Sequence, residues 1–458
     1  MAQPSIELKK VLELSLGSEI GMLRAFPVRI GEGRKAIAAV YSRDFDIDPY
    51  YEMFFFPTDT LKLTVFTQEG EILWTRDFGP TVIPGIWFCP VYPFDLDGDG
   101  VDEIWYVNNL NPVHQLSLQN SCLERLDGRT GQSLGQYPWV YQDTQQTLST
   151  QFRNFIAGGQ VRGEPVLVTA QGTYGNMYLQ GWNRDMSLRW EFRVGKDDPG
   201  ARGSHLCPVV DINQDGVDEI FWGERCVELD TGRELFCADR DTYRGHSDII
   251  QPMRDPASGA WSFYAIREGD PAASPRVLLY DAAGARRWGE VGHGHMDMGW
   301  TARLKDDGGH VAMAIRIGAK TCGPDGRFHQ DRDEFTFDAV NGEPYTLPFS
   351  VYRTIPVDLN GDGFHELVRG VPGGDGEVLD RHGRSFGRVE GTVAMASRFM
   401  ELPGEQLLCF YPDGTIRVWA DANAADSGQA LARYRDPFYE NSQRLTGVGY
   451  NLCLMCGL

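Results

Sequence analysis

The sequence predicts an all-β protein, a β-propeller of eight four-stranded antiparallel blades. Three observations predict it: eight copies of one hairpin pattern, three acidic turns that each follow an apolar strand, and a period of about 55 residues per copy. Aromatic residues make up 12% of the chain, beside 53 glycines and 25 prolines, which suits many short strands joined by tight turns. No apolar stripe at helical spacing lasts beyond a few turns.

The repeated unit consists of two hairpins. In the first, an apolar strand ends near an aspartate, turns, and leads into a second apolar strand, as in residues 89–107, 207–223 and 353–370. In the second, turn residues separate two runs of β-forming residues, as hairpin loops of about two to five residues require. This second hairpin recurs at residues 65–74, 124–135, 181–190, 227–236, 279–288, 337–346, 378–387 and 418–434.

The whole chain, residues 1–458, is predicted to be a single propeller domain. Seven blades are the alternative, if one unit is degenerate or if the N-terminal strand closes the last blade. The expected repeats lie near residues 18–78, 86–139, 148–193, 201–238, 245–289, 293–347, 351–388 and 391–435.

Three acidic loops of the form Asp-x-Asp/Asn-x-Asp-Gly-x-x-Glu join the strands of first hairpins. Calcium takes about six to eight oxygen ligands, and a tight loop can turn alternate side chains toward one ion. The glycine permits the sharp turn, and the backbone carbonyl of the next residue would add a ligand. The predicted calcium ligands are Asp95, Asp97, Asp99, Val101 and Glu103, then Asp211, Asn213, Asp215, Val217 and Glu219, then Asp358, Asn360, Asp362, Phe364 and Glu366.

These loops are not EF-hands, because the position that needs a bidentate glutamate holds Tyr106, Trp222 or Arg369. They resemble instead the calcium loops of FG-GAP-type propeller repeats. A solvated acidic turn without metal is the alternative. If calcium binds, we expect it to pin the first hairpin of a blade rather than to take part in chemistry.

Four histidines lie just before the first strands of three successive units. Two of them begin a His-x-Asp motif, and residues two apart on an extended strand point the same way. The strand that opens each blade lines the central axis of a propeller, so adjacent blades would bring these groups together. The histidines are His205, His246, His293 and His295, and the aspartates are Asp248 and Asp297.

Three interpretations of this histidine cluster stay open. It could bind a transition metal such as zinc, for which imidazole, a carboxylate or Cys207 is a suitable ligand. It could supply acid–base groups, because imidazole titrates near neutral pH. It could also form inter-blade hydrogen bonds around the channel.

Three further residues are candidates for a site. Tyr174 stands in a Gly-Thr-Tyr-Gly turn, which indicates close approach of a ligand to the backbone or packing on a neighbouring blade. Arg202 could hold an anion with its bidentate fork or form a surface ion pair. His114 lies in a polar loop after a strong strand. We expect His310, His329, His365 and His382 on solvent-facing loops.

Charge and composition exclude several function classes. The formal charge is −21 and no basic run occurs, so nucleic acid is not an expected partner. No run of about 18 apolar residues is present, so no membrane partner is expected. The N-terminus lacks an apolar signal segment, which favours a cytoplasmic protein, or a secreted one whose signal has been removed. The nine scattered cysteines favour reduced thiols, and Cys453 and Cys456 are expected on a packed C-terminal strand, with half a metal site as the alternative.

On these residues the chain resembles propeller-type polysaccharide lyases. Residues 201–236, followed by YRGHSD at 243–248, are similar to rhamnogalacturonan lyases, in which a Gly-x-His strand, an acidic loop and a later Gly-His-x-Asp recur. Residues 108–115, 123–132 and 170–182 resemble ulvan lyases and rhamnose–glucuronate lyases. The resemblance covers most of residues 86–370.

The resemblance implies β-elimination at O4 of a uronic acid, with rhamnose-linked glucuronate as the expected substrate and a 4,5-unsaturated uronate as product. Such chemistry needs a cation to neutralise the C6 carboxylate, a base for the C5 proton and an acid for the leaving O4. By motif position, Arg202 would neutralise the carboxylate and His114 and Tyr174 would share the base and acid roles, with His205 as a further catalytic residue. Substrate contacts would be His246, Asp248 and Trp300, and a metal, with zinc as the candidate, would fall on His246, His293 and His295.

Two other function classes compete with the lyase. A non-enzymatic calcium-stabilised propeller that binds glycan or protein would carry the acidic loops without a converging His, Tyr and Arg set. A quinone-dependent dehydrogenase is suggested by the hairpins at residues 126–131 and 229–236, without a further cofactor signature. The fold alone does not decide among them. The expected partner is a uronate-containing oligo- or polysaccharide.

Overall fold

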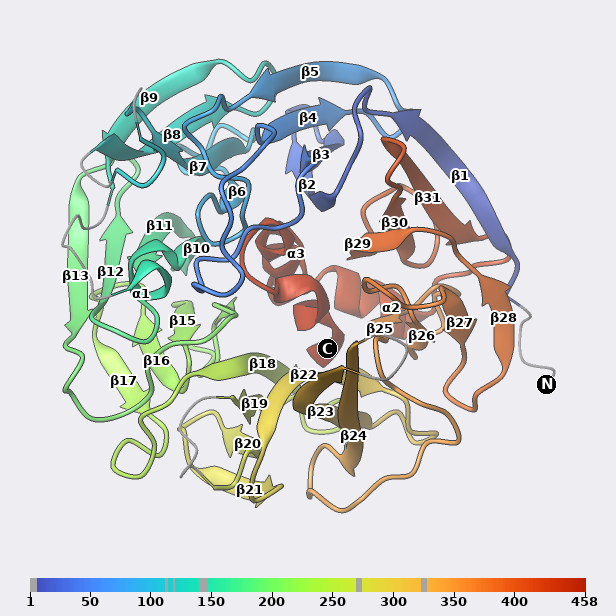
Figure 1. Ribbon diagram of the computed structural model, residues 1–458. Helices are drawn as coiled ribbons and strands as arrows, with labels where there is room; N and C mark the ends of the chain where they lie inside the picture. Colours follow the sequence, from blue (N-terminus) through green and yellow to red (C-terminus); the bar gives the residue numbers. More distant parts are fainter. Residues whose placement is uncertain (1–5, 112–113, 118–119, 140–146, 269–273, 323–327) are drawn as a thin grey trace.

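Eight antiparallel sheets stand in a ring around a central axis (Figure 1). The computed structural model describes residues 6–458 except 112–113, 118–119, 140–146, 269–273 and 323–327. Within these residues each sheet is one blade, and successive blades follow the chain around the ring. The prediction of an eight-bladed propeller is confirmed.

Consecutive strands pair within each blade as a simple meander, except that the outer strand of the eighth blade is β1. The first four blades are β2 (Met22–Arg29), β3 (Lys35–Ser42), β4 (Lys62–Phe66) and β5 (Ile72–Asp77); β6 (Val91–Phe94), β7 (Glu103–Asn109), β8 (Ser121–Asp127) and β9 (Ser133–Pro138); β10 (Asn154–Val161), β11 (Glu164–Gln171), β12 (Met177–Trp182) and β13 (Leu188–Val194); and β14 (Val209–Val210), β15 (Glu219–Trp222), β16 (Arg225–Glu228) and β17 (Glu234–Cys237). A short helix, α1 (Leu148–Phe152), precedes β10.

The other four blades continue the same pattern. They are β18 (Ser247–Arg254), β19 (Trp261–Arg267), β20 (Val277–Asp281) and β21 (Arg286–Glu290); β22 (His295–Arg303), β23 (His310–Cys322) and β24 (Phe328–Asp338); β25 (Ile355–Val357), β26 (Glu366–Val368), β27 (Glu377–Leu379) and β28 (Ser385–Arg388); and β29 (Thr392–Ser397), β30 (Gln406–Phe410) and β31 (Thr415–Asp421) with β1 (Leu8–Ser15). Among the described residues the sixth blade has three strands, and an isolated bridge between Phe337 and Pro344 stands where a fourth would pair.

The two ends of the propeller sequence close the ring. Strand β1 pairs antiparallel with β31, from Leu8 opposite Asp421 to Ser15 opposite Thr415 (Figure 1). The N-terminal strand therefore completes the eighth blade and does not reduce the number of blades to seven.

The core lies between the blades. In β3 every residue except Lys35 is buried, because the strand packs against neighbouring blades on both faces. The outer strand β5 alternates between exposed and half-buried residues. This difference explains why the inner strands have nearly continuous apolar runs, whereas the outer strands alternate apolar and polar residues.

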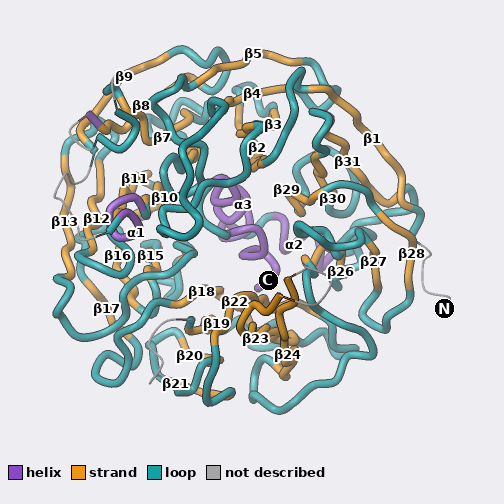
Figure 2. The backbone as a smooth tube through the Cα atoms, viewed as in Figure 1, coloured by secondary structure: helices purple, strands orange, loops and turns teal. Residues whose placement is uncertain are grey.

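The C-terminal segment fills the centre of the ring with helices (Figures 1 and 2). It contains α2 (Gly428–Tyr434), α3 (Pro437–Arg444), η2 (Leu445–Gly447) and η3 (Asn451–Gly457). Two predictions are therefore wrong: residues 418–434 are a strand followed by a helix, and Cys453 and Cys456 lie on a 3-10 helix rather than a strand. Ser427 and Asp436 cap α2 and α3, and Pro437 occupies the first turn of α3.

Two of the histidines expected on the surface are buried. His310 and His365 are 2% and 1% exposed, and burial lowers the pKa of His310 to about 3. His365 Nδ1 accepts a hydrogen bond from the Arg303 backbone at 3.0 Å. His382 is half-exposed, and His329 lies outside the residues whose side chains the structure describes. No helix within the described ranges has both the length and the apolarity needed to cross a bilayer.

Candidate active site

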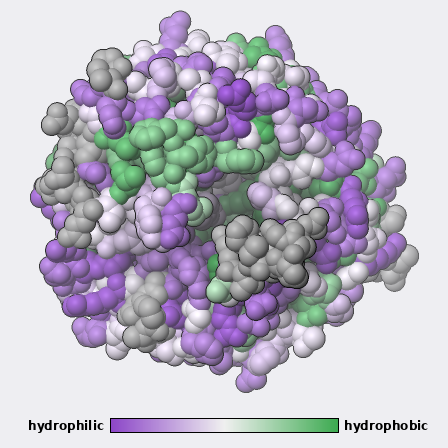
Figure 3. All heavy atoms as spheres, viewed as in Figure 1, coloured by the Kyte–Doolittle hydropathy of each residue, from purple (hydrophilic) through white to green (hydrophobic). Residues whose placement is uncertain are grey.

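A cavity of about 1630 Å³ opens at the end of the ring where the first strands begin. Figure 3 shows the hollow at the centre of this face. The C-terminal segment contributes Gly449, Tyr450 and Cys453 to its wall. Each blade contributes a residue at or just before its first strand, and these are Leu23, Ile86, Arg153, His205, His246, His295, Thr354 and Val393.

Tyr174, His205 and Asp248 form a continuous chain of polar contacts in this cavity. The phenol oxygen of Tyr174 lies 2.7 Å from His205 Nε2, and His205 Nδ1 lies 3.1 Å from Asp248 Oδ1. Tyr174 follows β11 in a turn with a φ of 78°, a left-handed conformation that costs a side-chain-bearing residue energy. Its backbone N–H donates to the carbonyl oxygen of Arg202 at 2.9 Å, which fixes the turn. The arrangement resembles a nucleophile–base–orienter triad, with a phenol as the outermost group.

Both His-x-Asp motifs lie at β-bulges. The pairing of β18 with β19 shifts register around Asp248, and that of β22 with β23 shifts around Asp297. A bulge leaves one extra residue unpaired and re-aims its side chain. His246 Nε2 lies 3.9 Å from Asp248 Oδ1, and His295 Nε2 lies 3.9 Å from Asp297 Oδ1. Each motif therefore brings its imidazole and carboxylate to the same side, as predicted from their spacing.

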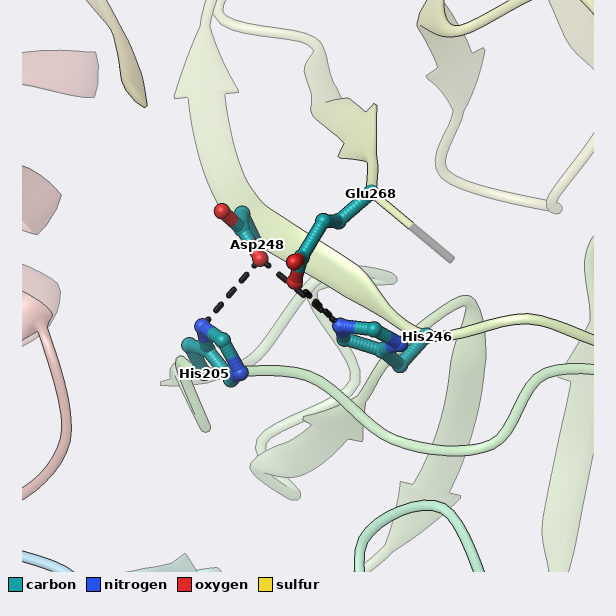
Figure 4. A group of neighbouring side chains, drawn as sticks. All are labelled: His205, His246, Asp248 and Glu268. Carbon is teal, nitrogen blue, oxygen red and sulfur yellow. Dashed lines mark hydrogen bonds and ion pairs between the residues drawn. The ribbon is translucent and has the colours of Figure 1, made fainter. Parts of the chain in front are cut away.

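Glu268 is a member of the site that the sequence did not reveal. It comes directly after β19 and hydrogen-bonds His246 Nε2 through one oxygen, while its other oxygen lies 2.8 Å from His295 Nε2. Figure 4 shows that Glu268 and Asp248 converge on the two imidazoles of His205 and His246. The ligand atoms of these four residues all lie within 4.8 Å of one another, so they could hold one metal ion.

Burial sets the protonation of this group. It lowers the pKa of His205, and the nearby Arg153 guanidinium adds to the effect. Burial likewise raises the pKa of Asp248, assisted by the charge of Glu268. Although burial opposes it, hydrogen bonds from His246 and His295 hold the pKa of Glu268 well below its usual range. These shifts favour the neutral form of His205, the protonated form of Asp248 and the ionised form of Glu268.

Arg153 is the second residue that the sequence did not reveal. It is 5% exposed, lies between α1 and β10, and stacks over the rings of Trp87 and Tyr174 with centroid distances of 4.5 and 5.3 Å. One nitrogen donates to Asp48 Oδ1 at 3.0 Å. Its Nε and Nη1 have no hydrogen-bond partner among the described residues. A buried guanidinium with free donors in a cavity is suited to binding an anionic group.

Arg202 lies elsewhere, contrary to its predicted role. Its guanidinium donates to the carbonyl oxygen of Gly195 at 2.6 Å and to that of Asp198, and its side chain is absent from the described lining of the cavity. The guanidinium N–H groups that were expected to bind a substrate carboxylate are therefore bound to backbone carbonyl oxygens of one loop. Arg202 contributes to the site through its own carbonyl, which holds Tyr174.

Three other predicted residues are placed as follows. His114 is exposed, accepts the Leu116 N–H at 3.1 Å through its own ring, and is not among the described cavity residues. Trp300 lines the cavity but is 2% exposed and donates its indole N–H to a backbone carbonyl. His293 is exposed beside Arg316, 3.3 Å away, so the expected trio of His246, His293 and His295 is not brought together.

Tyr450 comes from the C-terminal segment and was also not foreseen. Its ring packs edge-on against His205 and Trp87, with centroid distances of 5.5 and 5.0 Å. Its N–H donates to the carbonyl oxygen of His205 at 3.0 Å. The helical segment in the channel therefore supports the proposed site directly.

The three acidic loops lie at the other end of each first strand, remote from the cavity. All three close in the same way: the backbone N–H of the second loop residue donates to the final glutamate, and the glycine N–H donates to the first aspartate. These distances are 2.9 and 3.0 Å in the first loop, 3.0 and 2.9 Å in the second, and 2.9 and 3.0 Å in the third. Calcium bound there would be structural.

The loops differ in the charges around them. In the first, Asp95, Asp97 and Asp99 offer oxygens within 4.8 Å of one another, but Arg125 contacts both Asp97 and Glu103, and Arg29 Nη2 lies 3.6 Å from Asp95 Oδ2. The second has no basic partner among the described residues, and burial, with nearby aspartates, raises the pKa of Glu219 to about 8. The second donor set therefore fits calcium as it stands, whereas calcium at the first loop would have to share its ligands with Arg125.

The third loop already has a fixed cation. Arg433 on α2 lies 2.5 Å from Asp358 Oδ2 and 3.4 Å from Glu405 Oε1, and its side chain is 2% exposed. Calcium at this loop stays a prediction, and it would have to share Asp358 with a buried guanidinium.

The chain is similar in sequence to two rhamnogalacturonan lyases of Bacillus subtilis strain 168. It is 25% identical to the exolyase YesX over 288 residues, which cover 54% of this chain and 46% of YesX. It is 24% identical to the endolyase YesW over 275 residues, which cover 52% of this chain and 43% of YesW. The matches thus span less than half the length of these relatives. No family model matches the chain.

Solved structures of similar proteins share the fold. The rhamnogalacturonan lyase YesX superposes with a TM-score of 0.77 at 19% identity, covering 96% of this chain and 80% of YesX. YesW gives 0.73 at 16%, with coverages of 97% and 80%, and a Bacillus licheniformis rhamnogalacturonan lyase gives 0.73 at 18%, with coverages of 96% and 80%. The predicted resemblance to propeller-type polysaccharide lyases is confirmed at the level of sequence similarity and fold.

Proposed function

We propose, on the premise of this similarity to rhamnogalacturonan lyases, that the protein is a polysaccharide lyase acting by β-elimination. It would break the bond at O4 of a uronate and leave a 4,5-unsaturated uronate. One observation carries the proposal: a phenol–imidazole pair and a guanidinium line one cavity.

The carboxylate of the substrate is assigned to Arg153 instead of Arg202. Arg153 lines the cavity, and its positive charge beside the C6 carboxylate would make the C5 proton more acidic and stabilise the enolate-like charge that develops. Asp48 holds the opposite side of the guanidinium, and Trp87 supports its face. The fork is therefore already oriented before substrate arrives.

Tyr174 is assigned the proton transfers with the sugar. Both ring nitrogens of His205 are engaged, one by Tyr174 and one by Asp248, so the phenol is the group of the pair that can meet substrate. The phenol oxygen takes the C5 proton while its own proton passes to His205 Nε2. The C4–O4 bond then breaks, O4 takes the proton from Tyr174, and His205 returns the proton that it holds.

Asp248 and Glu268 position the two imidazoles. A protonated Asp248 sets the orientation of His205, and an ionised Glu268 fixes His246 and His295 by hydrogen bonds. His246 packs edge-on against Tyr174 with a centroid distance of 4.5 Å and completes the wall beside the phenol.

A metal-assisted lyase is the second candidate, and the closeness of four ligand atoms favours it. His205, His246, Asp248 and Glu268 fit a zinc-type ion, which would supply positive charge for the substrate carboxylate when bound. These residues replace the trio predicted from sequence. Metal analysis of purified protein, and activity after chelation and dialysis, separate this candidate from the metal-free relay.

The substrate class is a uronate linked to rhamnose, with calcium at the acidic loops as a stabiliser. The test is the ultraviolet absorbance of the conjugated double bond during incubation with rhamnogalacturonan, rhamnosyl-glucuronate oligosaccharides and ulvan. Absorbance that rises with rhamnogalacturonan or rhamnosyl-glucuronate supports the proposal. No signal with any of the three would favour a non-enzymatic propeller that binds glycan or protein.

A further inference from the structure

A group of exposed apolar side chains stands on the loop between β3 and β4. Tyr50, Tyr51 and Met53 are 40%, 73% and 57% exposed. Contiguous apolar surface of this kind marks interaction sites on soluble proteins.

The loop is built to present these side chains. Asp44 accepts hydrogen bonds from the backbone of Thr58 and Asp59, which ties the two ends of the loop together. Asp48 Oδ1 accepts the Tyr50 N–H at 2.7 Å, and the ring of Phe54 packs on Phe88 with a centroid distance of 5.9 Å. Because the backbone is fixed, little order has to be gained when a ligand binds.

The patch is continuous with the proposed catalytic cavity. Tyr50, Tyr51 and Met53 line the same cavity as Tyr174 and His205. Asp48 joins the two regions, because the oxygen that accepts from Tyr50 also accepts from Arg153. The rest of a ligand whose carboxylate binds Arg153 would therefore lie close to the loop that carries Tyr50.

The charge of the cavity wall near this loop indicates which sugar of the ligand binds there. Glu52 also lines the cavity here, whereas the charge of Asp48 is paired with Arg153. The Glu52 carboxylate disfavours a second uronate, and aromatic rings and a thioether stack well on the C–H face of an uncharged sugar. We infer that Tyr50, Tyr51 and Met53 form a platform for the uncharged sugar ring next to the uronate, and this inference rests on the proposed function.

The test compares Tyr51→Ala with Phe45→Ala. Phe45 is on the same loop and is equally exposed, at 73%, but is outside the described cavity lining. The substrates are a rhamnogalacturonan tetrasaccharide and a galacturonate tetramer. Loss of one stacked ring should raise KM for the rhamnogalacturonan tetrasaccharide about 5- to 10-fold at nearly unchanged kcat. Phe45→Ala should behave as wild type, and selectivity over the galacturonate tetramer should fall only in Tyr51→Ala.

Calorimetric binding of the same saccharides in a Tyr174→Phe background separates the two proposals. An active lyase whose KM is unchanged by Tyr51→Ala and Tyr50→Ala would overturn the platform and leave the function standing. If saccharide binding depends on Tyr51 but the protein with Tyr174 intact has no lyase activity, the platform would be supported and the proposed function overturned. Equal losses in Phe45→Ala, or binding to phosphatidylcholine vesicles instead of saccharide, would also overturn the platform.

Discussion

The phenol oxygen of Tyr174 lies 2.7 Å from Nε2 of His205, although the two residues come from different blades. Asp248, from a third blade, contacts the opposite nitrogen of the same imidazole. The ring closure of the propeller therefore assembles a proton path from three neighbouring blades. The first three predictions test that path and the guanidinium beside it.

Tyr174→Phe should lower kcat by about 10²- to 10⁴-fold, because it removes the phenol proton that His205 exchanges with substrate. The melting temperature should change little, since the ring still packs on His246. Steady-state kinetics and thermal unfolding measure the two effects. Tyr137→Phe, on outer strand β9, is the control and should retain full activity. A Tyr174→Phe enzyme with normal kcat would exclude the phenol from the chemistry.

Arg153→Gln should reduce kcat/KM by about 10²- to 10³-fold, because the developing charge on the carboxylate loses its neutralising fork. Arg153→Lys should recover part of the loss, since charge returns without the bidentate geometry. Arg202→Gln should instead lower the melting temperature, because its guanidinium is bound to two backbone carbonyls. If Arg202→Gln abolished turnover at unchanged stability, the carboxylate would belong to Arg202 after all.

The pH dependence of kcat should be flat on the acid side until well below the ordinary pKa of histidine, about 6.5. The relay needs a neutral His205, and burial lowers the pKa of this imidazole, so the neutral form persists as pH falls. An acid limb centred at or above pH 6.5 would contradict the assignment. Asp248→Asn should keep much more activity than Asp248→Leu, because an amide imitates the protonated carboxyl that burial favours.

Removal of calcium should lower the melting temperature without a change in the geometry of the cavity. At a calcium concentration about a hundred times Kd, binding stabilises the folded state by about 2.7 kcal/mol per site. Asp211→Ala should remove most of the calcium response, since the second loop has no basic partner among the described residues. Asp358→Ala should destabilise the fold with or without calcium, because the buried Arg433 loses the nearer of its two carboxylate partners and keeps only Glu405. Thermal unfolding with calcium or chelator measures each response.

The blades could be predicted because their signals are local. Turn residues, alternating strands and the acidic turns repeat along the chain, and each copy except those at residues 337–346 and 418–434 formed the predicted hairpin. The error at residues 418–434 came from extending this repeat over helix signals that the sequence does contain. Ser427 is a helix cap, and Asp436 followed by Pro437 is a typical helix start.

Contacts in the site could be predicted only where both residues belong to one short sequence motif. His246 and Asp248 are two apart and meet, as the strand geometry requires. Arg202 was assigned its role by its place in the motif before His205, but Gly203 between them has a φ of 90° and the Arg202 side chain binds the carbonyl oxygens of Gly195 and Asp198. Arg153 and Glu268 have no motif around them, and Tyr450 is carried in by the C-terminal segment. Only the closed ring places these three beside the imidazoles.

Isotope incorporation during cleavage of rhamnogalacturonan tests the central claim most directly. The wild-type protein is incubated with the polymer in water enriched in heavy oxygen, and the products are weighed by mass spectrometry. Elimination predicts fragments with one unsaturated uronate end, lighter than hydrolysis products by one water and free of heavy oxygen at the cleaved bond. Fragments that carry one heavy oxygen at that bond would show hydrolysis and would contradict the account.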